Sequence, residues 1–302
     1  MASGNQASEK RNIKFALVSN KRPESLKVAK SVLDFLAPRA TIEIEKDTAA
    51  ALGAKGKKLE EITADVVVCV GGDGTILKCL RSNPAPVFGI NTSIVGFLAE
   101  SSPVKMKRDL KKIIDWKFRI EERVKITAAL KGRKFPGAVN EIAVKSDIES
   151  KVIGTRIRLD GGTIEDVRGD GILVSTPSGS TAYAMSAGGP IVDPRVNAFL
   201  IVPIAPFRFG SRPIIVPVNS EIEIEITSRS GHILVDGFCE MEVREGDVLV
   251  CRKSKETGKF VRLCGGGASS EGIVASSGYR GSRDSGMNSV SRFYGRIGEK
   301  LR

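Results

Sequence analysis

The most constraining feature of the sequence is an unbroken apolar run that ends in a glycine-rich turn. Residues 65–70 read Asp-Val-Val-Val-Cys-Val and pass directly into Gly-Gly-Asp-Gly-Thr at 71–75. A continuous β-branched run of this kind is typical of a parallel strand whose two faces are both covered. A helical pattern follows at 76–81. A strand that turns directly into a helix is the repeating unit of α/β domains, so this segment favours such a domain.

The segments around this run support the same interpretation. Strands are predicted at 13–18, 41–45 and 86–90, and a helix is predicted to begin at Pro23. The apolar residues of that helix are spaced three and four apart, at Leu26, Ala29, Leu33 and Leu36. The alternation predicts an α/β domain with a mostly parallel sheet over residues 12–120.

The pattern changes near residue 120, where short β-branched segments separated by turns take over. Strict alternation at 220–227 places isoleucines on one face and glutamates on the other. Helical patterning in this part is confined to 181–187. Other short strand-like runs occur at 125–130, 137–144, 155–160, 171–175, 232–236 and 248–251. We therefore predict a β-sandwich domain over 121–251.

The remaining residues divide into three stretches. Residues 265–287 are rich in Gly and Ser and predict a flexible insertion outside either core. The flanking stretches, 252–264 and 288–302, are expected to rejoin the first domain.

Charge and composition narrow the classes of partner. The chain of 302 residues carries 47 Lys and Arg against 35 Asp and Glu, a formal net charge of +12. Such a charge suits an anionic partner, which could be a nucleic acid, a membrane surface or a phosphorylated small molecule. Aromatic residues make up only 5% of the chain, which argues against a protein that binds single strands by stacking their bases.

The content of His and Cys limits metal and disulfide chemistry. His232 is the single histidine, so a His-rich metal site is excluded. The five cysteines are odd in number and show no C-x-x-C spacing, which favours free thiols in a reducing cytosol.

No apolar run reaches the roughly 18 residues of a spanning helix, and residues 1–11 lack the apolar core of a signal peptide. We expect a soluble, cytoplasmic protein.

The glycine-rich turn at 71–75 is the first candidate site. Glycines after a buried strand allow a ligand to approach the backbone, and the helix that follows adds a partial positive charge, so the turn suits a phosphate. The spacing matches neither a Walker A loop nor G-x-G-x-x-G. A tight strand-to-helix turn without a ligand is the alternative interpretation. Asp73 could accept a proton from an attacking hydroxyl group.

Two further segments carry polar side chains suited to a nucleotide. The adjacent pair Asn140 and Glu141 could grip sugar hydroxyls and a base edge, although such a pair in a turn is usually structural. Residues 168–190 place a loop rich in Ser, Thr and Gly after the predicted strand 171–175. Its hydroxyls and free amides suit a nucleotide, and Ser180 or Thr181 could cap a short helix. A capped turn between strands is the alternative.

Taken together, these segments resemble the signature set of the NAD kinases, in the same order along the chain. The shared segments are Gly-Gly-Asp-Gly-Thr at 71–75, Asn-Glu at 140–141 and the long run Gly-Asp-Gly-Ile-Leu-Val-Ser-Thr-Pro-Ser-Gly-Ser-Thr-Ala-Tyr-Ala-Met-Ser-Ala-Gly-Gly-Pro from 169. The pentapeptide also occurs in diacylglycerol, sphingosine and 6-phosphofructo-type kinases, whereas the long run is specific. Gly96-Phe-Leu98 and the stretch 292–301 are similar to further parts of that family.

The resemblance implies an N-terminal α/β domain, a β-sandwich domain and a chain end that returns to the first domain. It implies phosphorylation of NAD at the 2′-hydroxyl of the adenosine ribose to give NADP. The donor would be ATP or, as in some relatives, inorganic polyphosphate. A divalent metal, expected to be Mg²⁺, would be held mainly by phosphate oxygens rather than by a protein cage. A homotetramer or homodimer is also implied.

The roles of individual residues follow from the same resemblance. Asp73 would be the general base, Gly74 would line its loop, and Asn140 and Glu141 would bind NAD. Basic contacts to phosphates would come from Lys78, Lys151 and Arg168. Asp170 would meet the adenine. The other residues expected to line the nucleotide sites are Gly71, Gly72, Thr75, Asn91, Thr181, Ala182, Tyr183, Ala184, Met185, Ser186 and Ala205. The chain departs from the family pattern at Phe207 and Phe238, where His and Gln are common, and at Ser93 and Val95, where Gly and Leu are common.

Three other functions were weighed against this one. A lipid kinase would share the 71–75 turn but leave the long Ser/Thr segment unexplained, and no amphipathic membrane-binding helix is evident. A sensor that binds a dinucleotide without catalysis would keep Asn140 and Glu141 but would not need Asp73. A nucleic-acid binder fits the charge, yet the sequence contains no recognised reading module.

Overall fold

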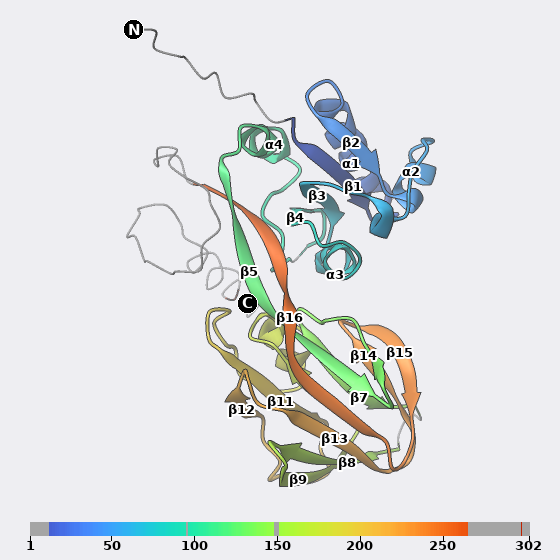
Figure 1. The fold of residues 1–302 in the computed structure, drawn as a ribbon, viewed down its shortest axis with the longest axis vertical. Helices are drawn as coiled ribbons and strands as arrows, with labels where there is room; N and C mark the ends of the chain where they lie inside the picture. The colour runs from blue at the N-terminus through green and yellow to red at the C-terminus, as the bar shows by residue number, and fades with distance from the viewer. Residues whose placement is uncertain (1–11, 95, 148–150, 265–296, 298–302) are drawn as a thin grey trace, which may run out of the picture. The chain divides into compact units, whose positions relative to one another are not determined.

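The chain forms two compact units. The structure is a computed structural model that describes residues 12–94, 96–147, 151–264 and 297. Of the described residues, those in 12–120 and 261–264 belong to the first unit, and those in 121–260 belong to the second (Figure 1). Residues 252–260, expected with the first domain, lie in the second unit, because strand β16 (Val248–Leu263) continues through it before the chain returns. Except for residue 297, the expected insertion at 265–287 and the stretch 288–302 lie outside the described residues.

A parallel sheet forms the centre of the first unit. Its strands are β1 (Lys14–Ser19), β2 (Thr41–Ile44), β3 (Val66–Gly71) and β4 (Val87–Asn91), paired in the order β2-β1-β3-β4. All three pairings are parallel, so the carboxyl ends of the four strands lie at the same edge. The end of β16 follows β4 in the order.

Helices cover both faces of this sheet. Helices α1 (Pro23–Leu36) and α4 (Met106–Ile114) pack in one core with alternate residues of β3, namely Val66, Val68 and Val70. On the other face, Cys69 lies beside Cys79 of α3 (Asp73–Ser82). The predicted parallel strand covered on two faces is therefore confirmed. The remaining short elements are α2 (Lys46–Ala51) and the 3₁₀ turn η1 (Leu59–Glu61).

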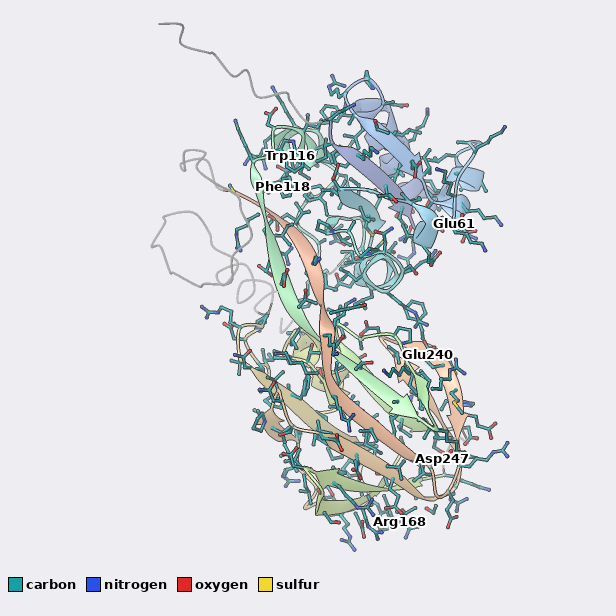
Figure 2. The ribbon with its side chains drawn as sticks, viewed as in Figure 1. Glu61, Trp116, Phe118, Arg168, Glu240 and Asp247 are labelled. Carbon is teal, nitrogen blue, oxygen red and sulfur yellow. The ribbon has the colours of Figure 1, made fainter. Side chains whose placement is uncertain are left out.

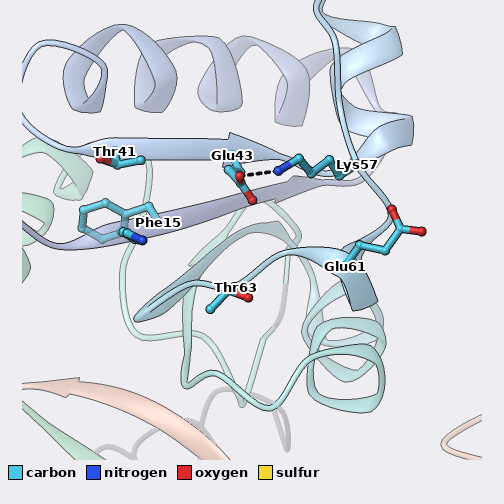
Figure 3. A pocket seen from close by; sticks show the side chains of 7 residues that line it. Phe15, Thr41, Glu43, Lys57, Glu61 and Thr63 are labelled. Atoms are coloured by element: carbon cyan, nitrogen blue, oxygen red, sulfur yellow. Dashed lines mark hydrogen bonds and ion pairs between the residues drawn. The ribbon is translucent and has the colours of Figure 1, made fainter.

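Two other features of the first unit lie away from the predicted site residues. The single tryptophan, Trp116, stacks on Phe118 with ring centroids 5.8 Å apart (Figure 2). A polar pocket of about 170 Å³ lies beside β1 and β2, where Lys57 and Glu43 form an ion pair across 2.6 Å (Figure 3). Its lining residues are Lys14, Phe15, Thr41, Glu43, Lys57, Glu61 and Thr63, none of which was predicted to bind a ligand.

The second unit is built from two antiparallel sheets. The first has six strands in the order β12-β11-β10-β7-β14-β15, and its strands β10 and β11 are buried throughout. Its strands are β7 (Glu141–Ser146), β10 (Gly171–Ser175), β11 (Ala198–Ile204), β12 (Ile214–Pro217), β14 (Gly231–Val235) and β15 (Phe238–Val243). All five pairings are antiparallel.

The other sheet places β16, β13, β8 and β9 side by side, and β5 pairs with β16 and β6. Its strands are β5 (Phe118–Leu130), β6 (Arg133–Lys134), β8 (Ile153–Leu159), β9 (Gly162–Gly169), β13 (Ile222–Ser228) and β16. Ile222, Ile224 and Ile226 enter one apolar core with residues from both sheets, as their alternation predicts. This packing of two sheets confirms the expected fold class. Among the described residues, no helix has the length and apolar character needed to cross a membrane.

Candidate active site

The 71–75 loop lies at the carboxyl edge of the parallel sheet. It joins β3 to α3, whose first residue is Asp73 and whose N-cap is Gly72. Gly71 packs tightly against Thr75, whereas a side chain at Gly74 would meet nothing within 4 Å. Exposed backbone at a helix N-terminus is suited to an anion such as a phosphate. The contact between Gly71 and Thr75 thus holds the loop, and the loop is open to a ligand at Gly74.

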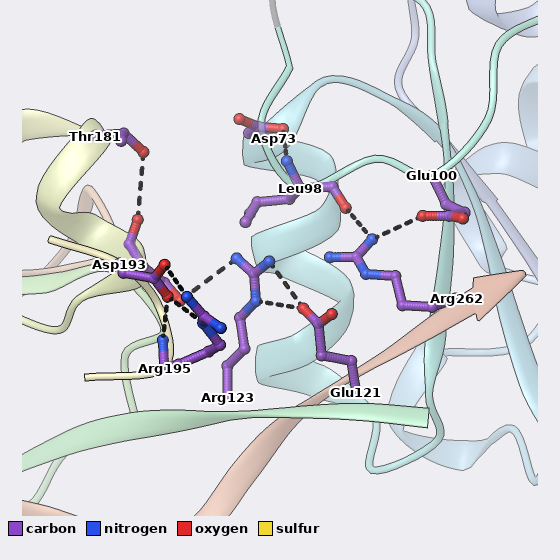
Figure 4. A network of polar contacts seen from close by, with 10 residues as sticks. Asp73, Leu98, Glu100, Glu121, Arg123, Thr181, Asp193, Arg195 and Arg262 are labelled. Carbon is purple, nitrogen blue, oxygen red and sulfur yellow. Dashed lines mark hydrogen bonds and ion pairs between the residues drawn. The ribbon is translucent and has the colours of Figure 1, made fainter. Parts of the chain in front are cut away.

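The Asp73 carboxylate is fixed by backbone hydrogen bonds. Its two oxygens accept the N–H groups of Phe97 at 2.8 Å and of Leu98 at 3.1 Å (Figure 4). These donors belong to the Gly-Phe-Leu stretch that the sequence singled out, so this stretch positions the carboxylate. The Leu98 carbonyl oxygen accepts from Arg262, which also pairs with Glu100 at 3.3 Å. Asp73 therefore has a defined orientation on a half-buried loop.

Two other predicted residues of the first unit organise neighbouring turns. Lys78 lies 3.2 Å from Glu45 and 3.9 Å from Asp47, so its ammonium group is paired in this structure. Glu45 also accepts the backbone N–H and hydroxyl of Thr48; burial alone would raise its pKa, but these bonds and Lys78 lower it. Asn91 hydrogen-bonds the backbone of the following turn through both ends of its amide.

Asn140 and Glu141 are held at the start of β7 by Asp236. The Asp236 carboxylate accepts the backbone N–H groups of Val139 at 2.9 Å, Asn140 at 2.7 Å and Glu141 at 3.2 Å. The predicted strand 137–144 begins only at Glu141 in the structure, because these amides bond a side chain and not a neighbouring strand. Asn140 and Glu141 are 8% and 7% exposed, so the fold holds both in place.

Glu141 is the most perturbed carboxyl group of the predicted set. Burial, followed by the nearby charge of Asp236, raises its pKa to about 8, and the backbone N–H of Tyr183 opposes this shift. Its Oε2 atom is buried without a hydrogen-bond partner among the described residues. Burial also raises the pKa of Asp236, against the three backbone N–H groups and Lys125, which lower it. A buried acid with such a pKa and an unpartnered oxygen is a candidate for a functional site.

The loop at 176–181 uses its hydroxyls for the fold. Thr176 donates to the Val139 carbonyl oxygen at 2.5 Å, and the Ser180 hydroxyl accepts from the N–H of Val192 at 3.0 Å. A side chain at Gly179 would collide with the carbonyl oxygen of Asn140. Thr176 and Ser180 were not among the residues predicted to bind the nucleotide, and both use their hydroxyls within the fold. They pack the loop against the Asn140 segment.

The expected helix after this loop is shorter than predicted. A 3₁₀ turn, η2 (Ser178–Thr181), precedes the single-turn helix α5 (Tyr183–Ser186). The N-cap of α5 is Ala182, which has no side-chain hydrogen bond, so the prediction that Ser180 or Thr181 caps the helix is wrong. The segment packs on the outer face of the six-stranded sheet through Ala184. Of the six predicted residues, Thr181 and Ala184 are buried, Ala182, Tyr183 and Met185 are half-buried, and Ser186 is exposed.

The remaining predicted residues of the second unit are exposed. Arg168 and Asp170 lie at the turn from β9 to β10, where the Asp170 N–H bonds the carbonyl oxygen of Ile204 at 3.0 Å (Figure 2). Ala205 follows Ile204 and has a φ of +43°. Lys151 is exposed at the start of the segment that leads into β8. The structure thus brings Arg168, Asp170 and Ala205 together.

The site residues fall into two groups, one on each unit. Gly71, Gly72, Asp73, Gly74, Thr75, Lys78 and Asn91 belong to the first unit, and all the other predicted residues belong to the second. The sequence reasoning did not select Asp236, although an Asp-Gly pair between two strand-like runs is a strong hairpin signal. Across the described ranges, no group of three or more His, Cys, Asp or Glu side chains could hold a metal ion.

Polar contacts within the second unit support this region. Arg123 pairs with Glu121 at 2.9 Å and lies over the ring of Phe260, 5.0 Å from its centroid (Figure 4). Arg195 forms two bonds to Asp193, at 2.9 Å and 2.8 Å. These pairs order the strand and the loop next to η2.

Comparison with known proteins matches both units to one family. Residues 18–118 match the ATP-NAD kinase N-terminal domain, and residues 139–263 match the ATP-NAD kinase C-terminal domain. An NAD kinase of Thermococcus kodakarensis is 38% identical over 263 residues, which cover 83% of this chain and 94% of the relative. An NAD kinase of Methanosarcina mazei is 36% identical over 249 residues, covering 80% and 86%.

A solved structure agrees with these relatives. The crystal structure of an NAD kinase from Archaeoglobus fulgidus in complex with ATP is 31% identical, with a TM-score of 0.68 over 82% of this chain and 93% of that one. A yeast NADH kinase complexed with NADH shares the fold, with a TM-score of 0.78 at 22% identity over 85% of each chain. With the Asp73 loop, the Asn140–Glu141 pair and the two-unit fold in place, these similarities show that the chain belongs to the NAD kinase family.

Proposed function

We propose that Asp73 is the general base with which this chain transfers a phosphoryl group from ATP to the 2′-hydroxyl of the adenosine ribose of NAD. The chain is an enzyme of the NAD kinase family, and ATP-dependent phosphorylation of NAD is the activity of that family. The observation that supports the role of Asp73 is its carboxylate, fixed by Phe97 and Leu98 at the start of an open glycine loop. A ribose hydroxyl is a poor nucleophile, so a positioned base contributes typically about 10²–10⁴-fold.

The NAD subsite is proposed on the second unit. Asn140 and Glu141 offer an amide and a carboxyl group with a free oxygen, which suit ribose hydroxyls. We assign Asp170 to the adenine and the lining of the subsite to Ala205 and the segment 181–186. Arg168 and Lys151 are exposed cations that suit the pyrophosphate, and Lys78 suits the donor phosphates at the loop of the first unit.

Phosphoryl transfer from ATP requires a divalent metal, which would supply positive charge to neutralise the charge that develops on the phosphates. We propose that this metal is Mg²⁺. The donor set near Asp73 fits a cation carried largely by the nucleotide, since Asp73 is the single carboxylate of the 71–75 loop. We also propose that polyphosphate can replace ATP as donor.

Assembly and location complete the proposal. A homodimer or homotetramer is supported by two large apolar side chains on one loop, Phe207 and Phe209, which are 77% and 96% exposed. Light scattering with Phe209→Ser would report a smaller particle if this loop lies in the interface.

A cytoplasmic location is supported by the cysteines, which are unpaired, with Cys239 exposed.

The decisive experiment measures NADP formation from NAD with ATP and Mg²⁺, and in parallel with polyphosphate. Asp73→Asn should lower kcat by about 10²–10⁴-fold while the Kd for NAD changes little, because the second unit carries the NAD subsite. Thermal unfolding of the same variant separates this effect from loosening of residues 97 and 98. Unchanged turnover in a folded Asp73→Asn enzyme would remove the general-base role. The lipid-kinase and non-catalytic sensor alternatives are not favoured by the family evidence.

A further inference from the structure

The residue that holds the Asn140–Glu141 segment comes from a tight hairpin turn. Asp236 and Gly237 form the two-residue loop between β14 and β15, closed by the pair Val235 and Phe238. Their φ angles are +49° and +81°, the signature of a type I′ turn, for which Asp-Gly is a preferred sequence. Asp236 therefore has a backbone conformation that few residues other than glycine adopt, and its side chain carries a carboxylate. The turn directs this carboxylate at the neighbouring strand β7.

Burial raises the pKa of Asp236, and its hydrogen bonds act in the opposite direction and favour its charged form. Besides accepting three backbone N–H groups, Asp236 donates its own N–H to the carbonyl oxygen of Glu141 at 2.9 Å. A carboxylate that accepts several backbone N–H bonds is stabilised as the anion. Lys125 of β5, which is 5% exposed, interacts with this charge.

Glu141 has the opposite surroundings. One oxygen of its carboxyl group has no partner, and the group receives a hydrogen bond from the backbone N–H of Tyr183. The charge of Asp236 lies next to it and disfavours a second anion. The other charged groups in this region are Lys125 from β5 and, acting on Lys125, Glu256 and Lys259 from β16. Two neighbouring carboxyl groups in such a site share one proton.

We propose that Asp236 is a positioning residue for NAD: it fixes the backbone of Asn140 and Glu141, and, as the charged member of this carboxyl pair, it keeps the proton on Glu141. The inference rests on the proposed binding of NAD by Asn140 and Glu141. A neutral Glu141 offers an O–H donor and a carbonyl acceptor to the ligand, and it adds no negative charge opposite a dinucleotide that carries two phosphates. NAD affinity then depends on a proton that Asp236 controls.

The test measures the Kd for NAD from pH 6.5 to 9.5 in the wild-type enzyme and four variants. In the wild type, Kd should rise at high pH, by about tenfold per pH unit once Glu141 ionises. Asp236→Asn keeps a residue that accepts positive φ but removes the charge. Because the neighbouring anion is lost, the rise should begin about one pH unit lower than in the wild type. Glu141→Gln, a permanent neutral donor and acceptor, should give a Kd that does not change with pH.

The chain supplies a matched control in a second hairpin. Asp160 and Gly161 form the two-residue loop between β8 and β9, with φ angles of +51° and +84°. Asp160 also accepts the N–H of the residue opposite, Glu221, at 2.8 Å and donates to its carbonyl oxygen at 3.0 Å. Asp160 is exposed and was not predicted to bind NAD. Asp160→Asn should therefore leave the pH profile of NAD binding unchanged.

The outcomes separate this inference from the proposed NAD subsite. If Asn140→Ala leaves the Kd for NAD unchanged, the subsite itself is misplaced. If Asn140→Ala weakens binding but Asp236→Asn shows the wild-type profile, Asp236 does not control the proton and the inference is overturned. If Asp236→Asn fails to fold by circular dichroism, Glu141→Gln decides: a flat profile supports the inference, and a wild-type profile overturns it.

Discussion

Two glycine-containing loops of the predicted site, at 71–75 and 176–181, look alike in sequence but differ in how their glycines are packed in the structure. In the first unit, the 71–75 loop leaves Gly74 exposed with open space where a side chain would stand. In the second unit, the 176–181 loop is buried, and Gly179 is pressed against the carbonyl oxygen of Asn140. The first loop keeps its backbone available to a ligand. In the second loop, the glycine and the hydroxyl groups pack against and bond neighbouring segments of the fold.

The difference shows how the two halves of the proposed reaction are prepared. Asp73 is anchored by two N–H groups, so its position is fixed while the loop beside it stays open at Gly74. Glu141 is buried with an oxygen that lacks a partner, so the fold has already borne the desolvation cost of that group. A base needs access and orientation, whereas a binding group gains from being desolvated before the ligand arrives.

The largest effect expected from this comparison is on stability at alkaline pH. The pKa of Glu141 is raised from 4.5 to about 8, so the folded protein holds a proton that the unfolded chain has already released. Wild-type stability should therefore fall as pH rises from 4.5 to 8, by roughly 1.4 kcal/mol per pH unit, and then level off. Glu141→Gln lacks this loss, so its advantage over the wild type should grow across the same interval. Urea unfolding at pH 5, 7 and 9 measures it.

The control for this prediction is Glu245→Gln, at an exposed position in the turn before β16. Its unfolding curves should run parallel to those of the wild type at all three pH values. Parallel curves for Glu141→Gln as well would mean that Glu141 is not held neutral by the fold, and the contrast with Asp73 would lose its physical basis.

The next effect compares the glycines directly. Gly179→Ala should destabilise the protein by about 1–3 kcal/mol, because the new methyl group has no room beside Asn140. Gly74→Ala should leave stability equal or higher, since alanine favours the first turn of α3 by up to about 1 kcal/mol. Thermal unfolding of both variants gives the comparison. Gly74→Ala should instead affect activity: it should raise the KM for ATP, because the added methyl group would stand where the backbone approaches the phosphates. Similar stability losses in both variants would contradict the assignment of an open loop at Gly74 and a packed loop at Gly179.

Much of the fold could be predicted from the sequence because its signals are local. The β-branched run before residue 71 and the alternating isoleucines of β13 each carry their period in a few consecutive residues. Helix α4 was not predicted, although Met106, Leu110 and Ile113 are buried at helical spacing. Charged residues separate those three positions, and the start signal of Ser102 and Pro103 lies before the helix and was not used.

The details of the site depended on contacts between distant residues. Asp236 holds the backbone of Glu141 from a position 95 residues away in the sequence. Thr176 bonds Val139 from a position 37 residues away. A hydroxyl-rich loop reads the same whether its hydroxyls face a ligand or a neighbouring carbonyl group. The sequence alone therefore could not show that the hydroxyls of Thr176 and Ser180 bond neighbouring backbone groups.

The smallest effect tests Lys78, which the family resemblance assigns to a phosphate and the structure pairs with Glu45. Lys78→Ala should raise the KM for ATP by about tenfold, a loss of about 1.4 kcal/mol, with little change in kcat. Its stability cost should be about 0.5–1 kcal/mol, because Lys78 is 42% exposed and solvent screens the pair. The pKa of Glu45 is lowered from 4.5, so this cost is present above that pH and should disappear as acid protonates Glu45. Lys57→Ala, which breaks a pair with Glu43 of β2, is the matched control and should cost similar stability without changing the KM. An equal KM in both variants would leave Lys78 as a structural partner of Glu45 alone, and the first unit would then bind the donor through the 71–75 backbone without this side chain.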